Sequence, residues 1–396
     1  MSRPSVHLDP KGAAPVRARH PWIFSGAIAR VSGNPEPAGE VDVLDADGTF
    51  LGRGLFNPHS QIRVRLYTSE DEPLDGPFFA ARVRRAVALR SGLLDLADPV
   101  GACRLVFSEG DELSGLTVDR YGRHLVVLLT GLGIAGHREA ILDVLEEVLA
   151  PEGILLRTEK GIGEEEGLIL KDGPLRGQPP TEPIVIEEGS LRFAVDLRTG
   201  QKTGFYLDQR QNRARIAAYA AGRSVADVCA YTGGFSIATA KGGASSVVAI
   251  DASAGALDLA RRNAELNGVT DRVEAVRGDA FGWLAEQAEA GRSFDMIVLD
   301  PPRFARSRAG LRSALQGYQR LNALALDCLA SEGVLVTFSC SGRVSAEEFQ
   351  EAVARAATDR GRPLRILERL GQAPDHPVST ACPQSAYLKG LLCVAG

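Results

Sequence analysis

Several features are scarce or missing in this chain of 396 residues, and each absence excludes a class of protein. No apolar run approaches the roughly 20 residues that a membrane-spanning helix needs, so we expect no membrane partner. The six cysteines are scattered without a C-x-x-C pair, which argues against a structural zinc site or a disulfide framework, and we expect no metal. The N-terminal stretch lacks the apolar segment of a signal peptide, and with the unpaired cysteines this predicts a cytoplasmic protein.

Positive charge is not in excess either. The formal net charge is −5 at pH 7, whereas a protein that coats nucleic acid needs concentrated Lys and Arg to contact phosphates. A local patch still allows RNA binding, because Arg303, Arg306, Arg308 and Arg312 cluster after an Asp-Pro-Pro loop. This run is consistent with phosphate contact and equally with the solvated start of a helix. The length predicts two or three domains, and a hydrophobic content of 44% predicts an ample core.

The stretch from Val225 to Asp251 carries the most informative pattern. An apolar run over 225–229 has the length of a buried strand, a turn at Thr232-Gly233-Gly234 follows, and a helical period leads to a second apolar run that ends on Asp251. The order predicts a strand–helix–strand unit whose glycines let the backbone approach a ligand and whose carboxylate can accept ribose hydroxyls. The loop reads Y-T-G-G-F, so the G-x-G-x-x-G pattern of dinucleotide-binding proteins is missing.

Later segments repeat the pattern of a strand that ends in a polar or Gly-Pro cluster. They read R-G-D-A from Arg277, F-D-M-I-V-L-D-P-P-R-F from Phe294 and G-V-L-V-T-F-S-C-S from Gly333. This succession predicts one mostly parallel sheet, and in such sheets ligands bind at the carboxyl ends of the strands. Residues 363–369 and 387–394 are predicted to supply the last strands.

The chain before this sheet divides into two regions. Residues 1–72 contain short β-like runs with close turns, which predict a small β-barrel or sandwich. Residues 73–183 combine a helical pattern with paired strands around Tyr121-Gly122 and predict a compact α+β middle domain. Four prolines in 173–183 suggest a linker, so the domain with the parallel sheet is predicted to span residues 184–396.

The motifs from Tyr231, Leu299 and Thr337, together with one from Thr199 and one from Asp375, resemble in sequence and order those of the Rossmann-like class I S-adenosylmethionine-dependent methyltransferases. More closely, the chain resembles the bacterial 23S ribosomal RNA 5-methylcytosine methyltransferases that carry an N-terminal PUA domain, and the resemblance covers nearly the whole chain. It implies an α/β fold with a mostly parallel seven-stranded sheet, preceded by a PUA-like RNA-binding β-barrel and the middle domain. The matching stretches are T-G-Q-K-T-G-F-Y-L-D-Q-R from Thr199, Y-T-G-G-F from Tyr231, L-D-P-P-R-F from Leu299, T-F-S-C-S from Thr337 and D-H-P-V from Asp375.

The resemblance implies S-adenosyl-L-methionine as the cofactor. It places Asp251 at the ribose hydroxyls, although an acid at this position could also cap a helix, and it places Asp279 near the adenine amine. The backbone of the glycine loop would pass close to the methionine part, and a segment before the first strand would form a flap. The expected cofactor-binding residues are Phe205, Tyr206, Gln209, Arg210, Ala230, Tyr231, Thr232, Gly233, Gly234, Asp251, Asp279 and Asp300.

The resemblance also implies a partner, which is 23S ribosomal RNA or the assembling large subunit, and it is compatible with a homodimer. Arg63 and Arg65 lie on one face of a predicted strand and are candidates for RNA contact. Two prolines stiffen the loop after Asp300 and leave its carboxylate available to a base amine, although the loop could also be a structural turn. The candidate residues for the base site are Pro301, Pro302, Arg303 and Phe304.

Cys340 and Asp300 are the candidate catalytic residues. Carbon 5 of cytosine is not nucleophilic, so an enzyme must add a thiolate at carbon 6 to activate it. Cys340 follows a predicted strand and matches the family's nucleophile motif, although a free cysteine can also be a small buried hydrophobe. Many RNA 5-methylcytosine enzymes have a second cysteine in a Pro-Cys pair where this chain has Pro301-Pro302, which leaves the base of the elimination step unassigned.

Other functions fit parts of the pattern. Enzymes that methylate a guanine or adenine nitrogen use close variants of the D-P-P motif and need no thiol. A non-catalytic RNA-binding assembly factor would keep the fold without its chemistry. A nicotinamide dehydrogenase fits less well because the pyrophosphate loop is missing.

Overall fold

The computed structural model describes residues 3–159, 161–304 and 310–396, which fold into two compact units. The first unit comprises Met1–Ile186, Asp196–Leu207 and Pro374–Ser385. The second comprises Glu187–Val195, Asp208–Ala373 and Ala386–Gly396. No helix in the described ranges is both long and apolar enough to cross a membrane.

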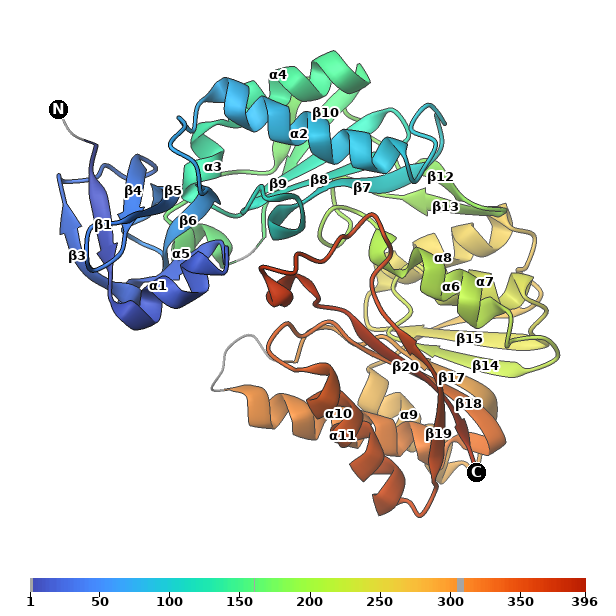
Figure 1. The fold of residues 1–396 in the computed structure, drawn as a ribbon. Helices are drawn as coiled ribbons and strands as arrows, with labels where there is room; N and C mark the ends of the chain where they lie inside the picture. Colours follow the sequence, from blue (N-terminus) through green and yellow to red (C-terminus); the bar gives the residue numbers. More distant parts are fainter. Residues whose placement is uncertain (1–2, 160, 305–309) are drawn as a thin grey trace. The chain divides into compact units, whose positions relative to one another are not determined.

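The first unit begins with a six-stranded sheet in the order β2-β6-β5-β4-β1-β3 (Figure 1). Alternating residues such as Val41 and Val43 are buried in a small apolar core, as expected for a strand, in which every second side chain points to the same face. Helix α1 begins where the Asp9 carboxylate accepts from the backbone N–H of Gly12 at 2.6 Å. The elements are β1 (Ser5–Leu8), α1 (Pro10–Arg17), β2 (Trp22–Phe24), β3 (Ile28–Ser32), β4 (Glu40–Leu44), β5 (Phe50–Phe56) and β6 (Ile62–Thr68).

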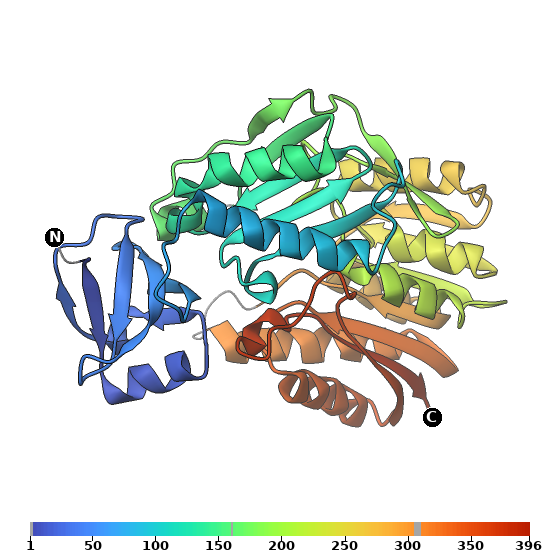
Figure 2. The ribbon, with the colours of Figure 1, turned by 45° about the horizontal axis from the view of Figure 1, so that its top comes forward.

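A five-stranded sheet, in the order β11-β10-β9-β8-β7, follows in the same unit. Helices α2 and α4 lie side by side on one of its faces and bury a core of their own with it (Figure 2). The linker interpretation of residues 173–183 was wrong in part, because Gly173–Gly177 pair with β10. The elements are α2 (Gly76–Ser91), β7 (Ala102–Phe107), β8 (Leu116–Tyr121), β9 (His124–Leu129), α3 (Leu132–Gly136), α4 (Arg138–Leu149), β10 (Gly153–Arg157), α5 (Ile162–Glu166) and β11 (Gly173–Gly177).

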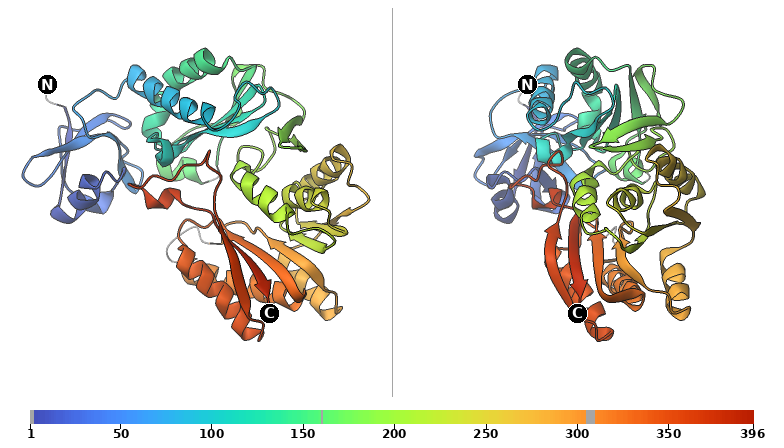
Figure 3. Two further views of the ribbon diagram at one scale, coloured as in Figure 1. Left: turned by 45° about the vertical axis from the view of Figure 1, so that its right-hand side comes forward. Right: turned by 90° about the vertical axis from the view of Figure 1, so that its right-hand side faces the viewer.

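The second unit is built on a seven-stranded sheet in the order β16-β15-β14-β17-β18-β20-β19. The first five of these strands are parallel, while β20 is antiparallel to both β18 and β19, which confirms the predicted mostly parallel sheet. Figure 3 shows the last two strands, in red, beside the orange strands of the same sheet. The strands are β14 (Ser224–Val228), β15 (Ser246–Asp251), β16 (Val273–Arg277), β17 (Phe294–Leu299), β18 (Leu329–Ser339), β19 (Leu364–Leu370) and β20 (Lys389–Ala395), and a hairpin of β12 (Ile184–Glu188) and β13 (Leu191–Val195) precedes them.

Helices cover both faces of this sheet, with α6, α7 and α8 on one side and α9, α10 and α11 on the other (Figure 1). The central strands are therefore mostly apolar, as the hydrophobic runs of the sequence predict, although β14 also buries Asp227. Helix α8 has the predicted serine cap, because Ser253 Oγ accepts from the N–H of Ala256 at 3.3 Å. The helices are α6 (Arg210–Ala217), α7 (Gly234–Lys241), α8 (Ala254–Leu266), α9 (Ala280–Glu289), α10 (Leu311–Asp327) and α11 (Ala346–Asp359).

Candidate active site

The candidate site lies at the carboxyl ends of the parallel strands of the second unit. Strand order reverses between β14 and β17, because the chain continues from β14 to β15 on one side and from β17 to β18 on the other. Such a switch point is where open α/β sheets bind ligands. Asp251 is the last residue of β15, and the loops that follow β14, β17 and β18 contain Tyr231, Asp300 and Cys340. The fold therefore brings together residues that are far apart in the sequence.

The loop after β14 holds its backbone in an unusual conformation. Cys229 has φ +65° and Tyr231 has φ +52°, and Gly233 follows with φ +79°. Left-handed backbone is uncommon for residues other than glycine and costs on the order of 1–3 kcal/mol where the surroundings enforce it. A Cβ on Gly233 would also lie 3.2 Å from the Cβ of Ala260, so both φ and space favour glycine there. Strain of this kind is typical of loops that bind ligands.

Asp251 is fixed by two backbone amides. Its Oδ2 accepts from the N–H of Tyr231 at 2.8 Å and its Oδ1 accepts from the N–H of Ser253 at 2.9 Å. The first bond ties the end of β15 to the glycine loop after β14. Each carboxylate oxygen has a further lone pair, so Asp251 can accept from a ligand while these bonds hold its orientation.

Asn263 positions the glycine loop from helix α8 and was not identified in the sequence. Its side chain donates to Thr232 O at 2.9 Å and accepts from the N–H of Ala194 at 2.7 Å, and the residue is fully buried. Asn263 therefore joins the loop to β13. The signal in the sequence was a polar residue on the apolar face of the predicted helix, among Leu257, Ala260 and Ala264.

Asp227 is a second residue that the sequence analysis missed. It lies inside β14, is completely buried, and accepts from Ser236 Oγ at 2.6 Å through Oδ2. Burial raises the pKa of its carboxyl to about 7, with a smaller contribution from the charge of Asp251. Within the described part of the chain, Asp227 Oδ1 has no hydrogen-bond partner. A buried acid with an unused oxygen beneath the loop is suited to an ammonium group.

Asp300 is held by Gln209, the N-cap residue of α6, and by β14. Gln209 Nε2 donates to Asp300 Oδ2 at 3.0 Å, and the Asp300 N–H donates to Val228 O at 3.3 Å. Asn212 in turn donates to Gln209 Oε1 at 2.5 Å and to Gly371 O at 2.9 Å. The structure therefore brings the predicted residues Gln209 and Asp300 into direct contact, and Asn212 orients the pair.

The remaining predicted cofactor residues lie in different settings. Asp279 is the N-cap of α9 and accepts from the N–H groups of Phe281 and Gly282 at 3.1 and 3.0 Å. Ala230 donates its N–H to Ile250 O at 2.9 Å, and Gly234 is the first residue of α7.

The residues of the predicted flap are divided between the two units. Arg210 opens α6 in the second unit and lies 3.9 Å from Glu188. Phe205 and Tyr206 belong to the first unit, where the Phe205 N–H donates to Tyr121 Oη at 3.1 Å and Tyr206 Oη donates to Gln201 at 2.7 Å.

The D-P-P-R-F loop and Cys340 meet at one corner of the sheet. The thiol of Cys340, directly after β18, donates to Pro301 O with a distance of 3.8 Å between sulfur and oxygen. Pro301 is buried, while Pro302 and Arg303 are exposed. The ring of Phe304 packs on that of Tyr318 with centroids 4.7 Å apart, so part of this side chain belongs to the core rather than to a stacking surface.

The other cysteines lie in apolar surroundings. Cys103, Cys328, Cys382 and Cys393 are buried, and burial raises the pKa of the last three to about 11, 11 and 12. Cys229 is partly exposed, yet burial of its thiol and the charge of Asp251 raise its pKa well above the ordinary range. A thiol with a raised pKa is a poor nucleophile at neutral pH.

The prediction for Arg65 was wrong. Its guanidinium lies in the interior of the first unit, 2.8 Å from Glu166 Oε1, because a charged group can be buried when an opposite charge accepts from it. The period-2 argument identified a face of the strand but could not tell that α5 covers it. Arg63 is partly exposed and donates to the carbonyl oxygen of Pro58. Arg306 and Arg308 of the basic run lie outside the described residues.

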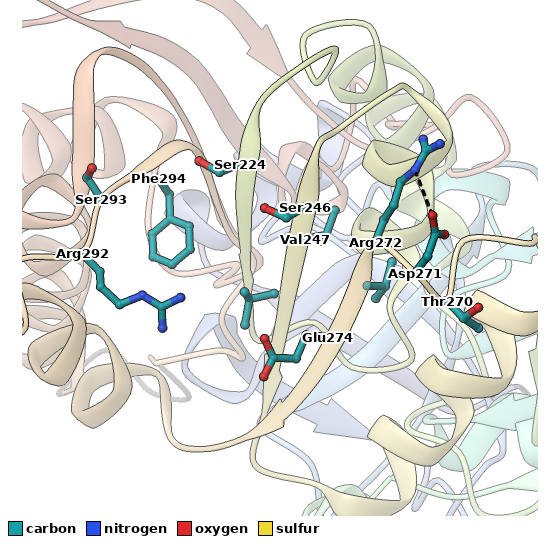
Figure 4. Close-up of a pocket in the computed structure, with 12 residues that line it drawn as sticks. Ser224, Ser246, Val247, Thr270, Asp271, Arg272, Glu274, Arg292, Ser293 and Phe294 are labelled. Carbon is teal, nitrogen blue, oxygen red and sulfur yellow. Dashed lines mark ion pairs between the residues drawn. The ribbon is translucent and has the colours of Figure 1, made fainter.

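A polar pocket of about 340 Å³ lies at the opposite, amino-terminal end of the seven-stranded sheet. Figure 4 shows Ser224, Ser246 and Phe294 at the starts of three strands, with Arg272 next to Asp271. The ion pair between these two residues measures 3.8 Å, and Arg292 donates to Gln287 at 3.2 Å. The pocket is at the end of the sheet where α/β folds do not place ligands, and we assign no function to it.

The arrangement fits S-adenosylmethionine. Asp251 can accept from ribose hydroxyls while two backbone amides hold its carboxylate, and Asp227 is buried at the end of β14 that leads into the glycine loop. The strained loop between them allows close approach of the backbone. Fold and site together define a class I methyltransferase that binds S-adenosylmethionine.

Comparison with known proteins gives the family. A family model described as S-adenosylmethionine-dependent methyltransferase matches residues 174–393, and one described as PUA-like domain matches residues 6–69. Proteins called ribosomal RNA large subunit methyltransferase I are 46% identical in Aeromonas hydrophila and 43% identical in Tolumonas auensis, in both cases over 98% of this chain and 98% of the relative. A crystal structure of a protein classed as a methyltransferase, complexed with SAH, has a TM-score of 0.87 at 20% identity and covers 98% of this chain and 99% of its own. The chain belongs to the S-adenosylmethionine-dependent methyltransferases, in the family of the large-subunit methyltransferase I proteins.

Proposed function

We propose that this protein transfers a methyl group to carbon 5 of a cytosine in 23S ribosomal RNA, with Cys340 as the nucleophile. The observation that carries the proposal is the contact between the Cys340 thiol and Pro301 O, which joins the loop after β18 to the D-P-P loop after β17. The names of the relatives support large-subunit ribosomal RNA as the substrate.

The chemistry explains why a thiol is needed. Cytosine carbon 5 becomes nucleophilic when the Cys340 thiolate adds to carbon 6 and the electron pair of the ring double bond shifts toward carbon 5. Carbon 5 then bonds to the electrophilic methyl group of S-adenosylmethionine, the bond between that methyl group and the sulfonium sulfur breaks, and S-adenosylhomocysteine is the leaving group. A base takes the carbon-5 proton, the bond between sulfur and carbon 6 breaks, and the thiolate is released. One methyl group has then replaced one proton, and the enzyme is unchanged.

Asp300 is proposed to orient the base. Its carboxylate is held by Gln209, and the two prolines after it keep the loop extended. An acceptor fixed in this way suits the exocyclic amine of cytosine. The base has to leave its stack to reach the corner between β17 and β18, because a paired or stacked base cannot present carbon 6 to a side chain.

RNA binding by the PUA-like region is a further part of the proposal. We propose three domains, with the RNA-binding barrel at residues 1–72, the α+β domain at 73–183 and the methyltransferase domain at 184–396. The match of the PUA-like family model to residues 6–69 supports the first of these. Arg63, which is partly exposed, remains a candidate for phosphate contact, whereas Arg65 does not.

The test traps the covalent step. The full-length protein is incubated with S-adenosylmethionine and large-subunit ribosomal RNA that contains 5-fluorocytosine, which has no proton at carbon 5 to lose, so release of the thiol is blocked. We expect a protein–RNA adduct that survives denaturation and maps to Cys340 by peptide mass. Cys340→Ala should form no adduct and lose at least about 1,000-fold in methyl transfer, as expected for loss of a covalent nucleophile.

Cys328→Ala is the matched control, because Cys328 is a buried cysteine of the same unit that lies away from the D-P-P loop. It should keep its activity. Full activity of Cys340→Ala with a methylated purine in digested RNA would overturn the proposal in favour of nitrogen methylation. Failure of the wild-type protein to bind S-adenosylmethionine in calorimetry would instead favour a non-catalytic assembly factor.

A further inference from the structure

Lys389, which no motif of the sequence singled out, reaches the residues on both sides of Cys340. It is the first residue of β20, and its backbone lies opposite Ser339, the last residue of β18. Partners across an antiparallel pair have Cα atoms about 4.5–5.5 Å apart. The side chain then turns toward the residue after the cysteine, and Nζ donates to Ser341 O at 2.7 Å.

Ser341 is held from a second direction. It is fully buried, and its Oγ is 2.9 Å from the hydroxyl of Tyr318 on α10. The turn that presents Cys340 is therefore bound by a strand on one side and a helix on the other. Removal of the ammonium group would leave the carbonyl of Ser341 buried without this donor, which is costly.

The Cys340 thiol and thiolate make different demands on this corner. As a thiol, Cys340 can donate to Pro301 O, as observed. As a thiolate it has no proton to donate and would face the negative end of that carbonyl dipole. A thiolate at this position therefore needs a positive charge nearby, and Lys389 carries one.

The charges around Lys389 agree with this role. Burial lowers the pKa of Lys389 to about 8, while the charges of Cys340 and Glu348 raise it. Because electrostatic coupling is mutual, the ammonium stabilises the thiolate as the thiolate stabilises the ammonium. Glu348, at the start of α11, also accepts from the Ser345 N–H at 2.8 Å, so part of its charge is used locally.

The charged residues of the neighbouring edge strand have other partners. On β19, which pairs with β20, Glu368 binds Arg215 at 2.7 Å and Arg369 binds Gln350 at 2.6 Å.

We propose that Lys389 is a positioning residue for Cys340, whose ammonium group holds the turn after β18 through Ser341 and stabilises the Cys340 thiolate. The thiol proton leaves to solvent and Lys389 keeps its own proton. The role of this thiolate in catalysis rests on the proposed function, but the interaction between the two side chains does not. Lys389 thus links the final strand of the sheet to the reactivity of the cysteine.

The test measures Cys340 directly, without RNA. The full-length protein is alkylated with iodoacetamide between pH 5.5 and 10, and the rate at Cys340 is separated from the other cysteines by peptide mass. In the wild-type protein we expect an apparent pKa below the ordinary value of about 8.5. Lys389→Met should raise it by about one unit and slow alkylation at pH 7 roughly tenfold, whereas Lys389→Arg should keep most of the wild-type reactivity.

Lys241→Met is the matched control, because Lys241 is exposed in the last turn of α7. It should leave the profile of Cys340 unchanged. A Lys389→Met profile that coincides with the wild-type would overturn the proposal. If Lys389→Met does not fold, the wild-type protein still decides, since an apparent pKa of 8.5 or higher at Cys340 would also overturn it.

The outcome separates this inference from the proposed function. A low apparent pKa that depends on Lys389, together with full methylation by Cys340→Ala, would leave the interaction standing and remove its catalytic role. A Cys340 adduct with fluorinated RNA, together with an unchanged Lys389→Met profile, would support the proposed function and overturn the role of Lys389.

Discussion

The two ends of the seven-stranded sheet differ in which residues adopt a left-handed backbone in the connections between strands and helices. At the amino-terminal end, the turns that lead into β14, β15, β16 and β17 contain Gly222, Gly243, Gly268 and Gly291, all with positive φ. At the carboxyl end, the loop after β14 adopts the same left-handed backbone with Cys229 and Tyr231. Glycine makes such turns without strain, so these four turns avoid the cost that Cys229 and Tyr231 carry in the loop after β14.

The two ends also differ in how the surroundings shift the pKa values of their ionisable side chains. At the amino-terminal end, Asp295 accepts from the backbone and hydroxyl of Ser224 at 2.9 and 2.8 Å, and these bonds lower its pKa. At the carboxyl end, burial raises the pKa of Asp227 and lowers that of Lys389. The surroundings favour the charged form of Asp295 at the first end and disfavour the charged forms of Asp227 and Lys389 at the second. Shifts of the second kind are typical of functional sites.

Among the variants that compare the two ends of the sheet, the largest effect is expected from Asp251→Asn. The carboxylate accepts from the backbone N–H groups of Tyr231 and Ser253. In the variant one of these two donors would face the side-chain NH₂ group, and the charged acceptor for the ribose would be lost. We expect S-adenosylmethionine affinity to fall about 100-fold, since hydrogen bonds to charged groups contribute roughly 1.5–3 kcal/mol. Calorimetric titration measures this. Glu274→Gln, in the pocket of the amino-terminal end, is the control and should bind normally.

Asn263→Ala should destabilise the second unit by about 2–3 kcal/mol, because it leaves Thr232 O and the Ala194 N–H buried without their partners. Urea unfolding followed by circular dichroism measures the change. Asn267→Ala is a matched control, since Asn267, the C-cap residue of α8, also binds a residue of β13, Arg192, but at the surface. Equal losses for the two variants would show that burial at the glycine loop has no special importance.

Asp227→Asn should change how stability depends on pH. The folded-state pKa of about 7 lies above the ordinary value of 3.8, so the stability contribution of this carboxyl is fully present below pH 3.8 and is lost progressively as pH rises from there through 7. We expect the free energy of unfolding of the variant to rise relative to that of the wild-type protein by about 3 kcal/mol between pH 4.5 and 8. Denaturation of the cofactor-free protein at both pH values tests this, and a constant difference would contradict it.

The smallest expected effect concerns backbone strain. Cys229→Gly should stabilise the protein by up to about 1 kcal/mol, because glycine adopts φ +65° without strain. Gly291→Ala should have the opposite sign and a similar size, since φ is +66° and no atom lies close enough to clash with the new methyl group. Melting temperatures compare the two. The same sign for both would show that the two ends of the sheet do not differ in strain.

The fold was predictable where pattern and burial coincide. The apolar runs that lead to Asp251, Asp300 and Cys340 form strands with mostly buried residues. Their apolar character predicted the parallel sheet and placed these three residues at its carboxyl end. Motif resemblance then supplied the cofactor. Both arguments depend on short stretches of chain, which is why they succeeded.

What the sequence could not show depends on contacts between distant segments. Arg65 is buried because Glu166, about a hundred residues later, accepts from it, and no local period reports such a partner. Asn263 and Lys389 act through carbonyl groups of other segments, and a carbonyl is present at every residue. Their importance therefore emerges only from the three-dimensional structure.

The position of β20 has a consequence for the growing chain during synthesis. This strand is the last of the sheet in sequence, yet it lies between β18 and β19 rather than at the edge. While the ribosome has yet to deliver residues 389–395, β19 has no partner and the edge of β18 is open. Domains generally fold as units during translation, so this one can close only with its final segment. Until that segment is made, the turn after Cys340 lacks the hydrogen bond that Lys389 donates to Ser341 O.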